Sequence, residues 1–166
     1  MSEKKVALIP ARSGSKRVKN KNINKLEKHP LIAYTIQSAL SSNIFDEIIV
    51  STDSSEIKKI SEYYGANVPF IRPKEYAKDT SPDIEWVKHS LDYLKNNGVD
   101  YDIFSILRPT SPFRKPKTIL RAFNLFKSNK DDLFSSDLKK SFSEWHDVSD
   151  HNDKDLYHHF CIHLLV

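Results

Sequence analysis

The sequence predicts an α/β fold of three layers, in which helices cover both faces of a mostly parallel, doubly wound sheet. Three observations lead to this fold class. Short apolar runs, each with no room for a helix, recur along the chain. Segments with helical apolar spacing separate these runs through residue 136. Strands and helices that alternate in this way form right-handed βαβ units and bury a parallel sheet on both faces.

The predicted strands are the apolar runs themselves. In chain order they are Val6–Ile9, Glu47–Val50, Val68–Ile71, Ile103–Leu107 and the shorter Leu133–Ser136. The segment 10–29 is too polar and irregular for a regular element. We therefore expect it to form a long loop after the first strand.

Start and stop residues mark the predicted helices. The starts are Pro30, Ser54 or Ser55, the pair Ser81 and Pro82, and Pro116, and the stops are Gly65 and Gly98. Proline costs nothing at a first helical position, because its missing N–H would be unpaired there. Serine hydroxyls cap unpaired N–H groups, and glycine accepts the left-handed backbone that often follows a helix.

The segment from Val6 to Ile23 carries the strongest functional pattern. Its apolar run ends at Pro10, and a loop rich in cations follows: Arg12, Lys16, Arg17, Lys19, Lys21 and, just beyond, Lys25. Open α/β sheets bind ligands in such loops, at the carboxyl ends of their strands. We expect these cations to act with free backbone N–H groups on Ser13, Gly14 and Ser15 as an anion cradle. The hypothesis is that this loop binds a polyphosphate.

The net charge of +4 conceals an asymmetry along the chain. Residues 1–30 contain nine Lys and Arg against two acidic residues, whereas the remaining chain contains seventeen against twenty. A nucleic-acid-binding protein more often spreads its cations along one face with aromatic side chains between them. Cations on both sides of a small-residue turn favour a compact anionic ligand instead, although a merely solvated basic terminus would have the same composition.

Length and composition indicate one soluble domain. A chain of 166 residues can bury a sizeable core. No apolar run reaches membrane-spanning length, and the N-terminus lacks a signal pattern. The single cysteine, Cys161, excludes an internal disulfide framework. We expect a cytoplasmic protein without a membrane or nucleic-acid partner.

Residues 139–166 break the alternating pattern, so we expect an atypical C-terminal tail after a domain of residues 1–138. Five of the seven histidines and the only cysteine lie in this tail. His158, His159, Cys161 and His163 suggest a metal site. Zinc ligands, however, usually come in separated pairs that close a turn. The spacing favours a frayed terminal strand or an irregular tail over a metal site.

The loops after the first four predicted strands should open onto one edge of the sheet. They carry many cations, several hydroxyls and at least one carboxylate: Arg12, Lys16, Lys21, Asp53, Arg72, Asp79, Ser81, Arg108, Thr110, Ser111 and Arg114. Phosphoryl and nucleotidyl transfer need such groups, because cations offset charge on phosphate oxygens and a carboxylate can hold a divalent metal. The absence of G-x-x-x-x-G-K-S/T and G-x-G-x-x-G motifs disfavours P-loop ATPases and Rossmann dehydrogenases.

Several of these residues also have a structural interpretation. The alternatives are helix capping by Asp53, a surface ion pair of Asp79 with Lys74 or Lys78, rim positions for Arg108 and Arg114, and turn capping by Thr110 and Ser111.

Four stretches, in this order, resemble the acylneuraminate cytidylyltransferases, the CMP-N-acetylneuraminate synthetase family. They are IPARSGSKRVKNKNI at 9–23, IIVSTDSSEI at 48–57, RPKEYAKDTS at 72–81 and LRPTSPFR at 107–114. The resemblance covers about residues 4–136. It implies a fold like that of the nucleotide-diphospho-sugar transferases.

The resemblance also implies a reaction. CTP would bind with Mg²⁺ or Mn²⁺, the anomeric hydroxyl of a nonulosonic acid would attack the α-phosphate, and pyrophosphate would leave. The implied catalytic residues, which hold the triphosphate, are Arg12, Lys16 and Lys21. The implied nucleotide-binding residues are these three with Ala11, Ser13, Gly14, Ser15, Asn22, Arg72 and Ser81. The implied sugar-binding residues are Arg108, Thr110 and Ser111. Asn22 would contact the base, although a turn-forming polar residue is the alternative. The metal ligands stay unknown.

The chain departs from the family pattern in two respects. Arg108 replaces the usual Gln before Pro-Thr-Ser-Pro, near the sugar, which allows a legionaminic- or pseudaminic-type acid. Family members are longer, with a later pair of metal-binding aspartates and elements that build a homodimer. Asp150, Asp153 and Asp155 do not match that pattern, so we expect a truncated chain. The alternatives are a non-catalytic CTP-binding remnant and a nucleotidyltransferase for another acidic sugar, such as 3-deoxy-octulosonate.

Overall fold

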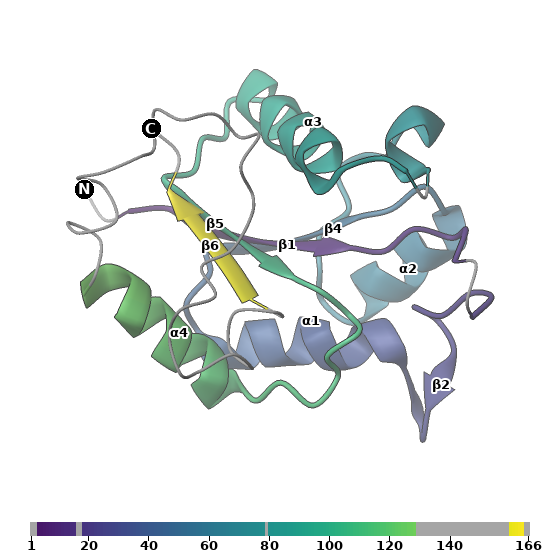
Figure 1. Ribbon diagram of the computed structural model, residues 1–166, viewed down its shortest axis with the longest axis horizontal. Coiled ribbons are helices and arrows are strands. Elements are labelled where there is room, and N and C mark those ends of the chain that lie inside the picture. Colours follow the sequence, from purple (N-terminus) through teal and green to yellow (C-terminus); the bar gives the residue numbers. More distant parts are fainter. Residues whose placement is uncertain (1–2, 16–17, 79, 129–159, 165–166) are drawn as a thin grey trace.

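A four-stranded sheet lies at the centre of the fold (Figure 1). The computed structural model describes residues 3–15, 18–78 and 80–128, together with the backbone of 160–164. The strand order is β4 (Glu47–Ser51), β1 (Lys5–Pro10), β5 (Ile103–Leu107) and β6 (Phe160–Leu164). β1 is parallel to β4 and to β5, whereas β6 runs antiparallel to β5. The predicted mostly parallel sheet is therefore confirmed.

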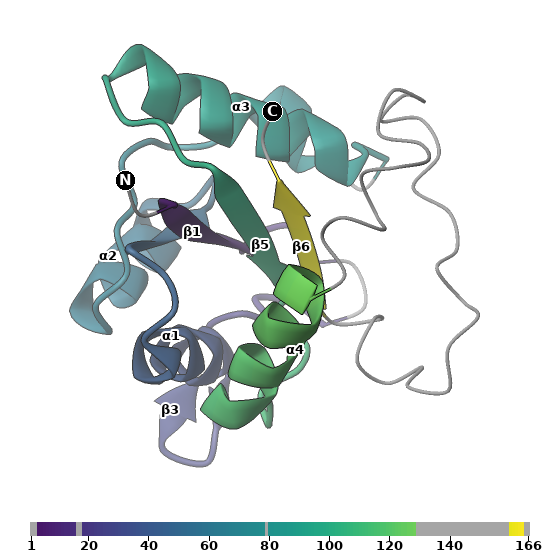
Figure 2. The same cartoon turned by 90° about the vertical axis from the view of Figure 1, so that its left-hand side faces the viewer.

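Helices cover both faces of this sheet (Figure 2). One face carries α1 (Leu31–Ser42), α2 (Ser55–Tyr63) and α4 (Pro116–Ser128), and the other carries α3 (Asp83–Asn96). Alternate residues of β1 enter the two cores: Ala7 packs with α1, α2 and α4, whereas Leu8 packs with α3. Because both faces of the strand are buried, its sequence is continuously apolar. The three-layer prediction is confirmed.

The third predicted strand, Val68–Ile71, does not form. The sheet edge there gains only a bridge, in which Asn67 N–H donates to Ile48 O and Val50 N–H donates to Asn67 O. Pro69 lies two positions after Asn67, where the next ladder bond would form, and it has no N–H to donate, so the pairing stops. An apolar run alone did not reveal this interruption.

Two helix starts differ from the predictions and two agree, one of them the start of α4 at Pro116. Ser54 caps α2, because its Oγ accepts a bond from Ile57 N–H at 3.3 Å. Pro30 lies at the N-cap of α1 rather than inside the helix. Ser81 does not cap α3, since Pro82 is the N-cap and the Ser81 hydroxyl instead donates to Glu75 O at 2.7 Å.

The long loop after β1 contains a small hairpin that the sequence did not indicate. It consists of β2 (Lys25–Leu26) and β3 (His29–Pro30), paired antiparallel. Glu27 adopts a left-handed backbone with φ of 56°, which permits the tight turn. A short 3₁₀ helix, η1 (Lys74–Ala77), similarly interrupts the loop before α3.

The fifth predicted strand, Leu133–Ser136, and the boundary at residue 138 lie outside the described residues. The tail contributes β6, in agreement with the terminal-strand interpretation. The tail cluster of His158, His159, Cys161 and His163 has no described side chains, so the metal hypothesis for it stays open. None of the described helices combines the length and apolarity needed to cross a membrane.

Candidate functional site

A polar cavity of about 270 Å³ lies where the loops after β1 and β5 meet the segment before α3. The described residues that line it are Pro10, Arg12, Ser15, Lys21, Asn22, Arg72, Tyr76, Lys78, Ser81, Asp83, Trp86, Arg108, Pro109 and Thr110. Five of these are Lys or Arg and one is Asp. This surplus of positive charge suits an anionic ligand.

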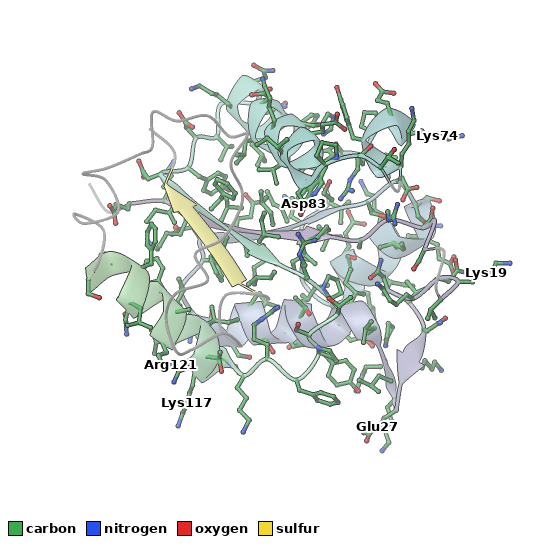
Figure 3. The ribbon with its side chains drawn as sticks, in the orientation of Figure 1. Lys19, Glu27, Lys74, Asp83, Lys117 and Arg121 are labelled. Atoms are coloured by element: carbon green, nitrogen blue, oxygen red, sulfur yellow. The ribbon has the colours of Figure 1, made fainter. Side chains whose placement is uncertain are left out.

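Other cations of the same loops face away from the cavity. Figure 3 shows Asp83 near the middle of the molecule beneath α3, whereas Lys19 and Lys74 point outward at the periphery. Both lysines are exposed. The folded chain therefore selects only some of the basic residues that the sequence places in these loops.

Asp53 anchors the first loop to the end of β4. Its Oδ1 accepts from Ser13 N–H and its Oδ2 from Ser13 Oγ, both at 2.8 Å. Ser15 N–H donates to Ser13 O at 3.0 Å. The expectation of free N–H groups on Ser13 and Ser15 is therefore wrong, because both are used inside the loop. The capping role considered for Asp53 is also wrong, since Ser54 caps α2.

Asn22 joins the two ends of the same loop. It is 6% exposed, its Nδ2 donates to Arg12 O at 3.1 Å, and its own carbonyl accepts from Ile32 N–H at 2.9 Å. Ala11 N–H donates to Ser51 O, which continues the pairing of β1 with β4 to the cavity. The position of the Arg12 backbone is thus set from two sides. The Arg12 guanidinium donates to Ala77 O at 3.4 Å.

Arg72 is the most buried cation of the cavity, with 4% of its surface exposed. Its Nε–H donates to Ser51 Oγ at 2.9 Å and its terminal NH2 group donates to Ser51 O at 2.6 Å. The guanidinium also lies over the Trp86 ring, 5.0 Å from the centroid. Burial lowers the pKa of Arg72 to about 10, so the side chain still carries its charge at neutral pH.

Arg108 forms an ion pair with Asp83, the first residue of α3. Asp83 Oδ1 also accepts from Trp86 Nε1–H at 2.9 Å. Burial acts to raise the pKa of Asp83, but the hydrogen bonds from Arg108 and Trp86 outweigh it and hold that pKa below its ordinary value. Asp83 therefore stays ionised and connects two walls of the cavity.

The loop after β5 places Arg114 differently from the prediction. Arg114 is 9% exposed, so it is not a rim charge. Its guanidinium donates to Arg108 O at 3.4 Å, and its own carbonyl accepts from Ser38 Oγ at 2.6 Å. Burial lowers the pKa of Arg114 to about 10. This arginine supports the loop from behind rather than facing the cavity.

The cavity brings together most of the site residues that the sequence indicated. Those that line it are Arg12, Ser15, Lys21, Asn22, Arg72, Ser81, Arg108 and Thr110. Those in the same loops that do not line it are Ala11, Ser13, Gly14, Asp53, Ser111 and Arg114. Lys16 and Asp79 lie outside the described residues.

Six lining residues were not among the predicted site residues: Pro10, Tyr76, Lys78, Asp83, Trp86 and Pro109. The spacing of Asp83 and Trp86 was the available signal. An acidic residue in the first turn of a helix, three positions before a tryptophan, can accept the indole N–H on the same face.

The described residues do not supply a ready set of protein ligands for a divalent metal. No three of their His, Cys, Asp or Glu side chains gather in one place. Asp53, the carboxylate nearest the first loop, already accepts two bonds from Ser13.

Comparison with known proteins shows which family the chain matches. Residues 6–159 match the family model described as "Cytidylyltransferase". The chain belongs to the cytidylyltransferase family. The resemblance seen in the four sequence stretches is therefore confirmed.

Three relatives illustrate the range within this family. The chain is 44% identical to the N-acylneuraminate cytidylyltransferase of Escherichia coli, over 77% of this chain and 29% of the relative. It is 47% identical to the CMP-N,N'-diacetyllegionaminic acid synthase of Legionella pneumophila, over 74% of this chain and 53% of the relative. It is 38% identical to a pseudaminic acid cytidylyltransferase of Campylobacter jejuni, over 76% and 54%. The chain thus spans between about a third and about half of the length of these relatives.

Solved structures share the fold at lower identity. The CMP:2-keto-3-deoxy-manno-octonic acid synthetase complexed with CTP aligns with a TM-score of 0.61 and 22% identity, over 79% of this chain and 49% of that one. A 4-diphosphocytidyl-2C-methyl-D-erythritol synthase aligns with a TM-score of 0.59 and 12% identity, over 79% and 56%. The predicted nucleotide-diphospho-sugar transferase-like fold agrees with these likenesses.

Proposed function

We propose that this chain transfers CMP from CTP to a nonulosonic sugar acid and releases pyrophosphate. The observation that carries the proposal is the cavity at the strand ends, whose described lining has five cations and one carboxylate. Relatives that match these segments are named for CMP transfer to N-acylneuraminic, diacetyllegionaminic and pseudaminic acids.

In this proposal the triphosphate binds between the first loop and Arg72. Arg12 and Lys21 bring charge from the loop after β1, and Arg72 brings charge from the segment after β4. Because Ser51 and Trp86 already hold the Arg72 guanidinium, little reorganisation is needed as charge grows on the phosphate oxygens. Asn22 lines the same cavity, and its side-chain amide oxygen can accept a hydrogen bond from the nucleotide.

The proposed chemical step is a displacement at the α-phosphorus. The anomeric hydroxyl oxygen of the sugar acid forms the new P–O bond, and its proton passes to water. The bond to the bridging oxygen breaks, and pyrophosphate leaves with that electron pair. Cations that surround the triphosphate favour this step, because negative charge shifts to the leaving group.

We further propose that Mg²⁺ or Mn²⁺ enters bound to the triphosphate. Mg²⁺ is usually held by few carboxylates together with substrate phosphates. This fits the described residues, among which no three His, Cys, Asp or Glu side chains gather in one place. The proposal predicts that the free protein binds Mn²⁺ weakly in the absence of CTP, and that added CTP strengthens Mn²⁺ binding in a paramagnetic relaxation assay.

Calorimetry with CTP, UTP and ATP tests the nucleotide, and pyrophosphate release tests turnover. We expect CTP to bind most tightly, and a preference for UTP or ATP would contradict the proposal. Turnover should be assayed with the three sugar acids named above and with 3-deoxy-octulosonate. Turnover only with 3-deoxy-octulosonate would identify the other-acidic-sugar alternative. CTP binding with pyrophosphate release at background would identify a non-catalytic CTP-binding chain, which the partial coverage of the relatives makes the main alternative.

Arg12→Ala and Lys16→Ala test the first loop. Loss of a charge-assisted contact costs roughly 1.5–3 kcal/mol, so CTP affinity should fall by roughly tenfold to a hundredfold. Lys19→Ala is the matched control, because Lys19 belongs to the same loop but points outward (Figure 3). Unchanged CTP affinity in both test variants would remove the assignment of the triphosphate to this loop.

A further inference from the structure

The order of the strands separates the cavity into two ends. β4, β1 and β5 lie side by side in that order, so the loops that follow them are arranged in the same order along the sheet edge. Arg12 follows β1, and Arg108 and Thr110 follow β5. Arg72 comes later in the chain than α2, but its bonds to Ser51 and Thr52 hold it at the end of β4. A triphosphate held by Arg12 and Arg72 therefore leaves the β5 end for the second substrate.

The two ends also differ in charge. Asp83 is the one carboxylate among the described lining residues, and its ion pair is with Arg108. The charge of Asp83 also acts on Arg72, but its direct ion pair offsets the charge of Arg108. Arg12, Lys21 and Arg72 bring three positive charges to the other end. A polyphosphate gains more at the charged end. Arg108, whose charge is offset by Asp83, suits a singly charged group that it can bind by directed hydrogen bonds.

Arg108 has the geometry for such a group. A guanidinium offers five N–H donors in a fixed fork, and the fork matches a carboxylate. Asp83 contacts Arg108 through one terminal nitrogen. Asp83 is itself held by the indole of Trp86, which is 2% exposed. The direction of the remaining donors is therefore set by the packing of α3 against the sheet.

We propose that Arg108, oriented by Asp83, binds the carboxylate of the acidic sugar and sets the preference for sugar acids over their neutral analogues. The inference rests on the function proposed above and names the residue that recognises the sugar carboxylate. Asp83 is a positioning residue, which acts through Arg108. Its negative charge also disfavours the binding of phosphate at this end of the cavity.

The test compares each acid with its neutral methyl ester. The full chain is titrated calorimetrically with N-acetylneuraminate, N,N'-diacetyllegionaminate and pseudaminate, each as free acid and as ester, with saturating CTP present. The wild-type chain should bind at least one free acid about tenfold more tightly than its ester. Arg108→Gln should bring that ratio to about one and leave CTP affinity within about threefold.

Two further variants separate recognition from folding. Arg108→Lys keeps the charge but not the fork, so it should recover only part of the preference for the acid. Asp83→Asn keeps an oxygen that can accept from Trp86 but loses the ion pair, so the preference should fall while inorganic triphosphate binds more tightly. Thermal melting of each variant shows whether the fold is intact, and a merely structural role for Asp83 would not strengthen triphosphate binding.

Two results would overturn the inference. The first is an acid-to-ester ratio of about one for all three sugars in the wild-type chain. The second is an Arg108→Gln variant that loses as much affinity for CTP as for the acid, because Arg108 would then belong to the triphosphate end. In both cases, CTP binding by the wild-type chain would leave the proposed nucleotide function standing. Failure of the wild-type chain to bind CTP would remove that function and this inference together.

Discussion

Replacement of Asp53 separates two roles that a carboxylate at this position can have. In the structure both oxygens of Asp53 hold Ser13, one through the backbone N–H and one through the hydroxyl. If Asp53 anchors the loop, an amide in its place should preserve most of its function, because Asn can accept from the N–H and donate to the hydroxyl oxygen. If Asp53 instead bound a metal, the amide should be nearly as damaging as alanine.

The size of the effect follows from the two bonds. A hydrogen bond to a charged group contributes about 1.5–3 kcal/mol, and a neutral one contributes about 0.5–1.5 kcal/mol. Asp53 is half-buried, so solvent screens part of this difference. We expect Asp53→Ala to weaken CTP binding by about 3 kcal/mol, roughly a hundredfold, and Asp53→Asn by about 1 kcal/mol, less than tenfold.

Calorimetric titration with CTP, with and without Mg²⁺, measures both variants under one protocol. Ser13→Ala provides the matched control, since it removes the hydroxyl bond but keeps the bond from the backbone N–H to Asp53. Its loss should resemble that of Asp53→Asn. Equal, severe losses for Asp53→Asn and Asp53→Ala that occur only in the presence of Mg²⁺ would refute the anchoring role and indicate a metal ligand.

Three further predictions concern stability. Ser54→Ala should lower the unfolding free energy by about 1 kcal/mol, because Ser54 caps α2; urea denaturation checks this against Ser55→Ala, and equal losses would contradict it. The pKa of Asp83 is lower in the folded chain than in the unfolded one, so its ionised form stabilises the fold above about pH 4 and this stabilisation is lost on acidification. Asp83→Asn should therefore reduce the fall in unfolding free energy at acidic pH. An unchanged fall would argue against this role. Burial and the bond to Glu47 raise the pKa of Tyr101, so the stabilisation from its neutral hydroxyl is lost above about pH 10. In denaturation experiments, Tyr101→Phe should show a smaller fall in unfolding free energy at alkaline pH. An identical fall would exclude Tyr101 as its cause.

The strands that formed, and the one that did not, show how well an apolar run predicts a strand. Val6–Ile9 and Ile103–Leu107 are buried on both faces, and an uninterrupted apolar run is the direct consequence of that burial. Val68–Ile71 has a similar run, but Pro69 removes the N–H that a ladder needs. An apolar run indicates that a segment is buried. Whether the buried segment pairs with a neighbouring strand depends on the N–H groups that it can donate.

The predicted loops met at one place, but the roles of their residues changed. Arg12 and Lys21 line the cavity as expected, because parallel strands deliver their following loops to the same edge. Arg72 also lines it, although the strand predicted before it does not form, because Ser51 holds its guanidinium. Arg114, in contrast, supports a loop from behind. The roles assigned to the individual residues, the metal and the homodimer stay predictions.

By itself the sequence determined the layer order, the parallel strands and the gathering of cations at one edge, because local apolar spacing and chain order carry that information. Only the tertiary structure decided which partner each polar group has. Asp53 and Ser13 are 40 positions apart, Arg72 and Ser51 are 21 apart, and Arg108 and Asp83 are 25 apart. Such contacts depend on how helices and loops pack across the sheet, and no local periodicity records them.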